Sequence, residues 1–286
     1  MNNSAPIGIF DSGIGGLTVA HKVKELMPNE SMVYFGDIAH LPYGDKSAAA
    51  IQAYSIKVTD VLLQQGCKLI LMACNSASSA AFELVREYVG SKAKVFNVID
   101  PVVEHVSHHY SNQNVGLIGT KQTVNSNAYE SKLKQLNPTI ELKSLATPLF
   151  VPMIEEGFFE NRISHDIIAA YLQNEQLQQI EALILGCTHY PLIKNEISDF
   201  YNGKLDVLDS ASIVANKLQE FLQKYDLLST KKINKDRFLV SDITASFKAS
   251  ANIFFHEEVH LETFPIWDWE EVLWWIENPH LQLTPP

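Results

Sequence analysis

The sequence is poor in cysteine and lacks long apolar runs, and each shortage excludes some classes of protein. Only three cysteines occur in 286 residues, so they cannot all pair, and no Cys-x-x-Cys spacing suggests a zinc or redox site. No apolar run approaches the roughly 20 residues that a membrane-spanning helix needs, and the first residues lack the basic and apolar parts of a signal peptide. We therefore expect a cytoplasmic protein with free thiols and no membrane partner.

Basic residues are also scarce, with 22 Lys and Arg against 33 Asp and Glu and a formal net charge of -11. This balance argues against nucleic acid or an anionic membrane as the main partner and leaves a small molecule or another protein. Because the chain has only three arginines (Arg86, Arg162 and Arg237), we expect backbone and hydroxyl donors to hold any carboxylate ligand. The 46% hydrophobic content and the length suit a well-cored protein of two domains.

Short apolar runs alternate with longer amphipathic segments, which predicts a mainly parallel sheet covered by helices on both faces. The expected strands span 7–10, 32–35, 69–72, 95–99, 115–118, 140–142, 182–185 and 205–208. The expected helices span 17–26, 48–65, 76–88, 125–136, 164–173 and 210–225. The predicted fold class is therefore α/β.

The order of polar turns repeats between the two halves of the chain, each of which places one cysteine after a strand. This repeat predicts two similar α/β domains, each a mainly parallel sheet flanked by helices, with the active site in the cleft between them. The first domain would comprise 1–99 plus 209–286 and carry Cys74, and the second would comprise 100–208 and carry Cys187. Which sheet the last strands join is left open.

Cys74 and Cys187 each end an apolar run and precede small hydroxyl or amide residues. Each is therefore expected at the carboxyl end of a strand, where open α/β sheets bind ligands. A single buried cysteine is commonly a small core residue, the role we assign to Cys67, but two in equivalent turns suggest thiols facing one substrate. A helix start beside each thiol is expected to lower its pKa. His189 is either structural or the acid/base helper of Cys187.

Two further turns near the start of the chain hold polar groups. The glycine-rich segment 11–17 is either a tight strand-to-helix turn or a place where the backbone approaches an anion. Asp11 within it could pair with a substrate ammonium group or orient a thiol. The sequence Pro-Tyr-Gly at 42–44 reads as a turn, and alternatively the backbone amides of Tyr43 and Gly44 hold a carboxylate.

Three later features have both a structural and a functional interpretation. Thr120 and Thr123 form a polar turn suited to an oxygen-rich ligand. Glu155 lies in an apolar stretch and is either a solvated helix-end acid or part of a site. The segment 265–276 holds all four tryptophans and is interpreted as a final helix packed on the core or as a subunit or interdomain contact.

Motifs between residue 7 and about residue 210 together resemble the glutamate racemases. They are IGIFDSGIGGL at 7–17, YFGD at 34–37, PYG at 42–44, ACNSAS at 73–78, Gly119-Thr120 with Thr123, EEG at 155–157 and GCTHYP at 186–191. The last motif favours glutamate racemases over the related aspartate and hydantoin racemases. The sequence departs from the family at Ser76, where threonine is usual, and at 38–40, where Ile-Ala-His replaces Thr-Ala-Arg.

The resemblance implies a cofactor-independent interconversion of L- and D-glutamate that supplies D-glutamate for peptidoglycan. The implied catalytic residues are Cys74, Cys187, Asp11, His189, Asp37 and Glu155. Cys74 would take the proton from D-glutamate and Cys187 from L-glutamate, with Asp11 and His189 as their respective helpers. The implied substrate contacts are Asp11, Ser12, Tyr43, Gly44, Asn75, Ser76, Thr120, Thr123, Thr188 and His189. No cofactor and no metal are implied, and the family is often dimeric.

Two bases on opposite faces of a planar intermediate invert a stereocentre without moving, which one thiol per domain would allow. One rival is a related racemase acting on aspartate or a hydantoin. Another is a two-lobed amino-acid sensor whose cysteines are core residues. A cysteine hydrolase needs a single thiol and leaves the repeat unexplained.

Overall fold

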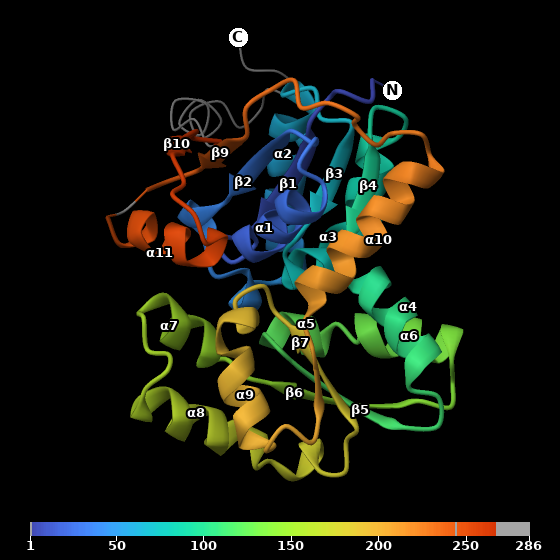
Figure 1. Cartoon of the computed structure of the whole chain (residues 1–286), viewed down its shortest axis with the longest axis vertical. Helices are drawn as coiled ribbons and strands as arrows, with labels where there is room; N and C mark the ends of the chain where they lie inside the picture. Colours follow the sequence, from blue (N-terminus) through green and yellow to red (C-terminus); the bar gives the residue numbers. More distant parts are fainter. Residues whose placement is uncertain (1, 244, 267–286) are drawn as a thin grey trace, which may run out of the picture.

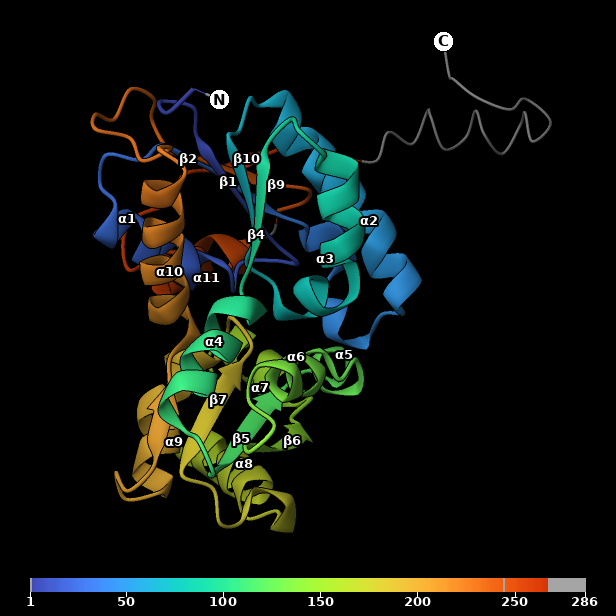
Figure 2. The same cartoon turned by 90° about the vertical axis from the view of Figure 1, so that its right-hand side faces the viewer.

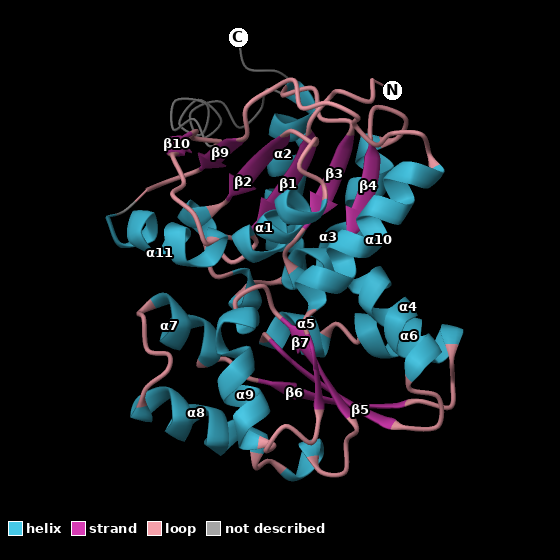
Figure 3. Ribbon diagram, viewed as in Figure 1, coloured by secondary structure: helices cyan, strands magenta, loops and turns pink. Residues whose placement is uncertain are grey.

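The computed structural model describes residues 2–243 and 245–266. Its strands lie in two sheets, one above the other in Figure 1, and each sheet is flanked by helices (Figure 3). The first has the order β10-β9-β2-β1-β3-β4 and the second the order β6-β5-β7-β8. All neighbouring strands in both sheets are parallel. The predicted α/β class with parallel sheets is confirmed.

The strands are short, and most are buried. They are β1 (Ile7–Asp11), β2 (Met32–Gly36), β3 (Leu69–Met72), β4 (Lys94–Asn97), β5 (Asn114–Gly119), β6 (Glu141–Ala146), β7 (Ala182–Gly186), β8 (Asp206–Leu208), β9 (Arg237–Val240) and β10 (Leu261–Thr263). Every residue of β1, β2, β3 and β7 is buried. A parallel strand covered on both faces needs an apolar side chain at nearly every position, which is why these read as continuous runs.

Helices connect the strands. The α-helices are α1 (Leu17–Leu26), α2 (Ala48–Gln64), α3 (Asn75–Val89), α4 (Ile99–His109), α5 (Lys121–Asn125), α6 (Ala128–Leu136), α7 (Phe150–Glu155), α8 (Arg162–Leu172), α9 (Lys194–Phe200), α10 (Ser210–Lys224) and α11 (Ala245–Phe255). Short 3₁₀ helices span Ile38–His40, Tyr43–Asp45, Glu175–Leu177 and Tyr190–Ile193. Within the described ranges, no helix combines the length and apolarity needed to cross a membrane.

The strand order of the second sheet repeats that of part of the first. β2-β1-β3-β4 corresponds to β6-β5-β7-β8, so β3 and β7 occupy equivalent positions. Cys74 comes shortly after β3 and Cys187 directly after β7. β9 and β10, which the sequence analysis did not predict, extend the first sheet beyond β2. The predicted boundaries of the two domains, at residues 100 and 209, remain a proposal.

Some expected elements differ from the structure for a local reason. The predicted strand at 95–99 ends at Asn97, because the Asn97 side chain accepts hydrogen bonds from the backbone N–H groups that begin α4. The predicted helix at 125–136 begins only at Ala128, since Asn127 adopts a left-handed conformation (φ 54°) and separates α6 from the short helix α5, which ends at Asn125. The predicted helix directly after Cys187 is wrong. A 3₁₀ helix containing Pro191 comes first, and α9 begins only at Lys194.

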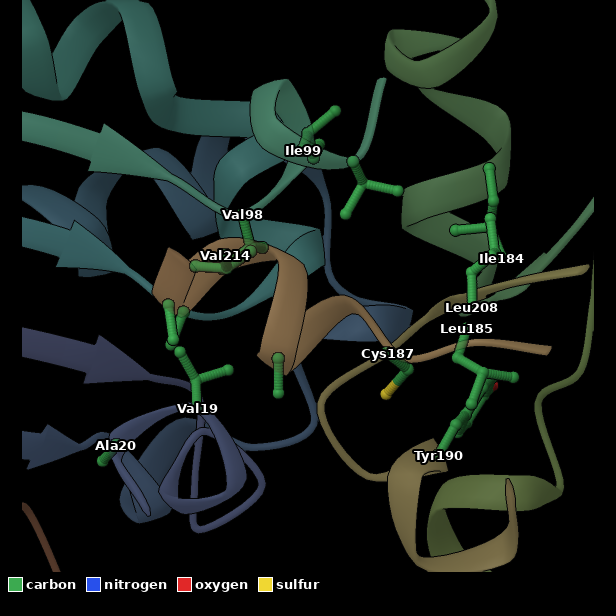
Figure 4. Packing of buried hydrophobic residues seen from close by; sticks show 14 of the residues in the cluster. Val19, Ala20, Val98, Ile99, Ile184, Leu185, Cys187, Tyr190, Leu208 and Val214 are labelled. Atoms are coloured by element: carbon green, nitrogen blue, oxygen red, sulfur yellow. The ribbon is translucent and has the colours of Figure 1, made fainter. Parts of the chain in front are cut away.

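A continuous cluster of buried apolar residues joins the two sheets. It includes Ile7 from β1, Val102 from α4, Leu185 from β7 and Val214 from α10, and Figure 4 shows members from both parts. α4 and α10 pack against each other and lie where the two sheets adjoin (Figure 2). The predicted Trp-rich helix lies outside the described residues apart from its first two positions.

Candidate active site

Cys74 and Cys187 line one small cavity although they follow strands of different sheets. The cavity has a volume of about 30 Å³. Both thiols are almost completely buried, with 5% and 6% of their surfaces exposed. Because each follows the carboxyl end of its strand, the two sheets present equivalent edges to the same space. The structure therefore brings the two thiols, which were predicted to face one substrate, to the wall of one cavity.

Most of the other residues predicted from the sequence also line this cavity. They are Ser12, Tyr43, Gly44, Asn75, Ser76, Thr120, Glu155, Thr188 and His189. Leu41 and Val151, which no sequence pattern marked as site residues, supply an apolar part of the wall. No lysine or arginine belongs to the lining given by the described residues, so hydroxyl, amide and backbone groups are the donors available to a carboxylate.

Cys74 caps the start of α3. Its sulfur accepts a hydrogen bond from the backbone N–H of Ala77 at 3.5 Å and lies 3.8 Å from the Ser12 hydroxyl. Burial, reinforced by the nearby Asp11 carboxylate, raises the pKa of the Cys74 thiol to about 12. The expectation that the helix start would lower this pKa is therefore wrong, because desolvation of a thiolate outweighs the helix-end effect. Cys74 rests as a neutral thiol.

Cys187 instead lies beside a positively charged side chain. His189 Nδ1 lies 3.8 Å from the Cys187 sulfur, and His189 Nε2 lies 2.9 Å from a carboxylate oxygen of Glu155. Burial alone lowers the pKa of His189, but the hydrogen bonds to Cys187 and Glu155 outweigh it and raise the pKa to about 10. His189 is thus an imidazolium at neutral pH, and it stabilises negative charge on the sulfur.

Asp11 reaches across to the turn that carries Cys187. Its carboxylate accepts hydrogen bonds from the Gly13 backbone N–H at 3.0 Å and from the Thr188 hydroxyl at 3.3 Å. Thr18 adds a second tie, since its hydroxyl donates to the Thr188 carbonyl oxygen at 3.0 Å. Asp11 is fully buried and burial raises its pKa, although His189 and these donors oppose the effect. Asp11 lies behind the cavity wall, outside the lining residues.

Asp37 and Thr123 also lie outside the lining. Asp37 is fully buried, and its carboxylate accepts hydrogen bonds from the hydroxyls of Tyr43 at 2.7 Å and Ser241 at 2.8 Å, with His40 Nδ1 at 2.8 Å. The arrangement fixes Tyr43, which does line the cavity. Ser241 follows β9, and no local sequence pattern connects it with Asp37.

The cavity is too small for an amino acid as it stands. A volume of about 30 Å³ accommodates about two water molecules. A neighbouring cavity of about 310 Å³ shares part of its wall, including Leu41, Thr120 and Val151. A Cβ placed on Gly44 would lie 2.6 Å from the Cβ of Thr120, so the segment after β2 and the segment after β5 approach each other closely here. We infer that these walls separate when a ligand enters.

Comparison with known proteins agrees with the motifs. Residues 16–218 match the family model described as Asp/Glu/Hydantoin racemase. The glutamate racemase of Chlorobium phaeobacteroides is 39% identical over 256 residues, covering 89% of this chain and 94% of that protein. That of Chlorobaculum parvum is 36% identical over 260 residues, covering 91% and 95%.

Solved structures give the same result. The glutamate racemase of Francisella tularensis, solved in complex with D-glutamate, superposes with a TM-score of 0.86 at 39% identity and covers 92% of this chain and 98% of that one. The enzyme of Thermus thermophilus, in complex with beta-chloro-D-alanine, gives a TM-score of 0.83 at 35% identity, covering 92% and 98%. The chain therefore belongs to the Asp/Glu/hydantoin racemase family and, within it, to the glutamate racemases.

Proposed function

We propose that this racemase interconverts L- and D-glutamate by a two-base mechanism in which Cys74 and Cys187 act on opposite faces of the substrate Cα. The observation that carries the proposal is that both thiols line one cavity from the edges of two different sheets. In each turnover one sulfur removes the Cα proton as thiolate, and the other delivers a proton as thiol. Both exchange protons with solvent before the next turnover in the same direction.

The unequal surroundings of the thiols support one assignment of roles. Imidazolium His189 beside Cys187 favours negative charge on that sulfur, while burial keeps Cys74 protonated. The free enzyme is then ready to deprotonate the enantiomer that faces Cys187, which we assign to L-glutamate. Cys74 would deprotonate D-glutamate.

Donors around the cavity would hold the substrate and the charge that develops on it. Asn75, Ser76, Thr120 and Thr188 line it with amide and hydroxyl groups. Such preorganised donors stabilise a carbanion best where water is excluded. Asp37 acts through Tyr43 and Asp11 through the Thr188 turn, so both carboxylates position residues rather than touch the substrate.

Solvent exchange tests the chemistry directly. The wild-type enzyme is incubated with L-glutamate in deuterium oxide, and proton NMR follows the Cα of both enantiomers. We expect deuterium in the product D-glutamate from the first turnovers while the remaining L-glutamate keeps its proton. Retention of the substrate proton in the product would indicate one base instead of two. Saturable glutamate binding without deuterium exchange at Cα would instead favour the alternative of a non-catalytic amino-acid sensor.

Three cysteine variants make a matched set. Cys74→Ser and Cys187→Ser should each lower kcat/KM for racemisation by about 10² to 10⁴, the usual effect of losing a general acid or base. Cys67→Ala is the control, because Cys67 is buried in the core beside Gly8 and outside the cavity. Wild-type activity in both Cys74→Ser and Cys187→Ser would exclude the two-thiol mechanism. The same assay with aspartate as substrate distinguishes a glutamate racemase from an aspartate racemase, since only the latter should racemise aspartate efficiently.

The wider role is proposed on the family resemblance. D-glutamate made in the cytoplasm would supply peptidoglycan synthesis, with the enzyme acting as a homodimer without cofactor. Expression of the chain in a bacterium that requires added D-glutamate should remove that requirement. Light scattering should give about twice the 32.1 kDa mass of one chain, and a monomer would contradict the dimer.

A further inference from the structure

The side chain of Asn75 has a donor without a partner. Asn75 is the first residue of α3, follows Cys74 directly and lines the small cavity with 3% of its surface exposed. Its Nδ2 is buried and has no hydrogen-bond acceptor among the residues that the structure describes. A buried amide NH₂ left unpaired is unfavourable, so this donor suits an acceptor brought by a ligand. A carboxylate oxygen of an amino acid is such an acceptor.

The other end of the Asn75 amide is held by Tyr129. The Tyr129 hydroxyl donates to Asn75 Oδ1 at 2.7 Å. Tyr129 lies on α6, beside the second sheet, with 1% of its surface exposed. Because an amide presents its acceptor on one side and its donors on the other, pairing Oδ1 with Tyr129 leaves the NH₂ group as the end of Asn75 that can donate to a ligand in the cavity. A flipped amide would turn its carbonyl oxygen toward a substrate carboxylate and repel it.

A second bond joins the same parts of the molecule. The hydroxyls of Ser76 and Thr120 lie 2.8 Å apart, again between the start of α3 and the segment after β5. The start of α3, which Cys74 caps, is therefore tied to the second sheet's helices at two adjacent residues. Loss of the Tyr129 bond would leave the Ser76 tie in place, so its effect should fall on the Asn75 amide.

We propose that Tyr129 is a positioning residue for the substrate: it fixes the orientation of Asn75 so that the Asn75 amide donates to a carboxylate of the bound amino acid. This inference rests on the proposed function, because the acceptor is the glutamate substrate. It accounts for a bond between two buried side chains 54 positions apart in the sequence and for the unpaired Nδ2 beside it.

The test separates positioning from a purely structural hydrogen bond. Tyr129→Phe removes only the hydroxyl, and the free amide then samples both orientations. We expect KM for glutamate to rise about tenfold, equivalent to about 1.4 kcal/mol, with kcat within about threefold of wild type. Tyr110→Phe is the matched control, since the Tyr110 hydroxyl donates to Asp206 at 3.1 Å away from the cavity. Its KM should stay at the wild-type value.

A double-mutant cycle then asks whether Tyr129 acts through Asn75. Asn75→Ala removes the amide and should raise KM at least as much as Tyr129→Phe does. In the Asn75→Ala background, Tyr129→Phe should add less than about a twofold change, because the group that it orients is absent. A Tyr129→Phe effect of equal size in both backgrounds would overturn the proposal, as would an unchanged KM in the single variant.

A third variant tests the same proposal independently, in case Tyr129→Phe does not fold. Asn75→Asp retains an oxygen for the Tyr129 hydroxyl but has no N–H to donate, so KM should rise by more than about tenfold. An unchanged KM in Asn75→Asp would overturn the proposal. Failure of the proposed function itself looks different, since the wild-type enzyme would then show no racemisation of glutamate at all.

Discussion

Replacing Glu155 by Gln removes the negative charge that helps to keep His189 protonated. Glu155 ends α7, and its carboxylate lies 2.9 Å from His189 Nε2. The Glu155 side chain is 20% exposed and the His189 side chain 5% exposed, so solvent screens the pair only partly. Glutamine keeps the size and an oxygen acceptor, and thus the substitution tests the charge with little change in packing.

The structure gives a magnitude for this effect. The pKa of His189 is raised from 6.5 to about 10, and burial opposes what Cys187 and Glu155 contribute. Losing one of two such partners should lower this pKa by about 1 to 2, roughly 1.4 to 2.7 kcal/mol. If the value falls to about 8.5, the imidazolium fraction at pH 9 drops from about nine-tenths to about one-quarter, which predicts about a fourfold loss of activity there.

The measurement is the pH profile of kcat/KM from pH 6 to 10.5, with His189 titrated by NMR in parallel. The alkaline limb of the Glu155→Gln profile should lie about 1 to 2 pH units below that of wild type. Glu156→Gln is the matched control, because Glu156 is the next residue, carries the same charge and is exposed. Coincident alkaline limbs in Glu155→Gln and Glu156→Gln would refute the link between Glu155 and the His189 charge.

Stability should follow the same linkage. The folded protein binds the His189 proton more tightly than the unfolded chain, so this contribution to the free energy of unfolding is complete below about pH 6.5. It declines as the pH rises through about 10. Glu155→Gln should therefore be less stable than wild type by about 2 kcal/mol below pH 8, and the difference should fade toward pH 10. Urea unfolding at several pH values checks the sign.

Two further substitutions test packing away from His189. Lys68→Met leaves Glu30 unpaired, since these side chains form an ion pair of 2.6 Å with 0% and 1% of their surfaces exposed. Urea unfolding should show a loss of about 3 to 5 kcal/mol with kcat unchanged in the folded enzyme, and a smaller loss than 1 kcal/mol would contradict this. Gly44→Ala places a Cβ 2.6 Å from Thr120 Cβ. We expect kcat/KM to fall at least about tenfold, because the residues that line the cavity are displaced. Wild-type kinetics would show that these residues adjust to the added methyl group without loss of activity.

The sequence predicted best the features that depend on short stretches of chain. The buried strands β1, β2, β3 and β7 are nearly continuous apolar runs, because covering a parallel sheet on both faces leaves no polar position. Polar residues that follow each run mark the strand ends, and the ends of parallel strands meet at one edge. For that reason the sequence alone places Cys74 and Cys187 at equivalent positions.

Features that depend on contacts between distant segments could not be predicted in this way. β9 and β10 have only four and three residues, and their place beside β2 is decided by tertiary packing. The bond from Tyr129 to Asn75 and that from Ser241 to Asp37 join residues 54 and 204 positions apart. The high pKa of Cys74 has the same origin, since a helix start is visible in the sequence but the depth of burial is not.

The unequal surroundings of the two thiols also predict unequal kinetics in the two directions. Burial and Asp11 hold Cys74 protonated, while imidazolium His189 lies 3.8 Å from the Cys187 sulfur. Under the proposed mechanism, the form of the free enzyme with the negative charge on Cys187 is therefore favoured over the form with the charge on Cys74, and the form that binds D-glutamate productively is the minor one. A minor binding form raises the apparent KM in inverse proportion to its population.

The equilibrium between the two enantiomers then determines how kcat must change with KM. Because the two enantiomers are equally stable, kcat/KM must be the same in both directions, so a higher KM for D-glutamate requires a higher kcat by the same factor. Under the proposed assignment of Cys187 to L-glutamate, both constants should be larger for D-glutamate in initial rates followed by circular dichroism. Glu155→Gln weakens the charge on His189 and should narrow the difference. Larger constants for L-glutamate would reverse the assignment of the two thiols to the two enantiomers.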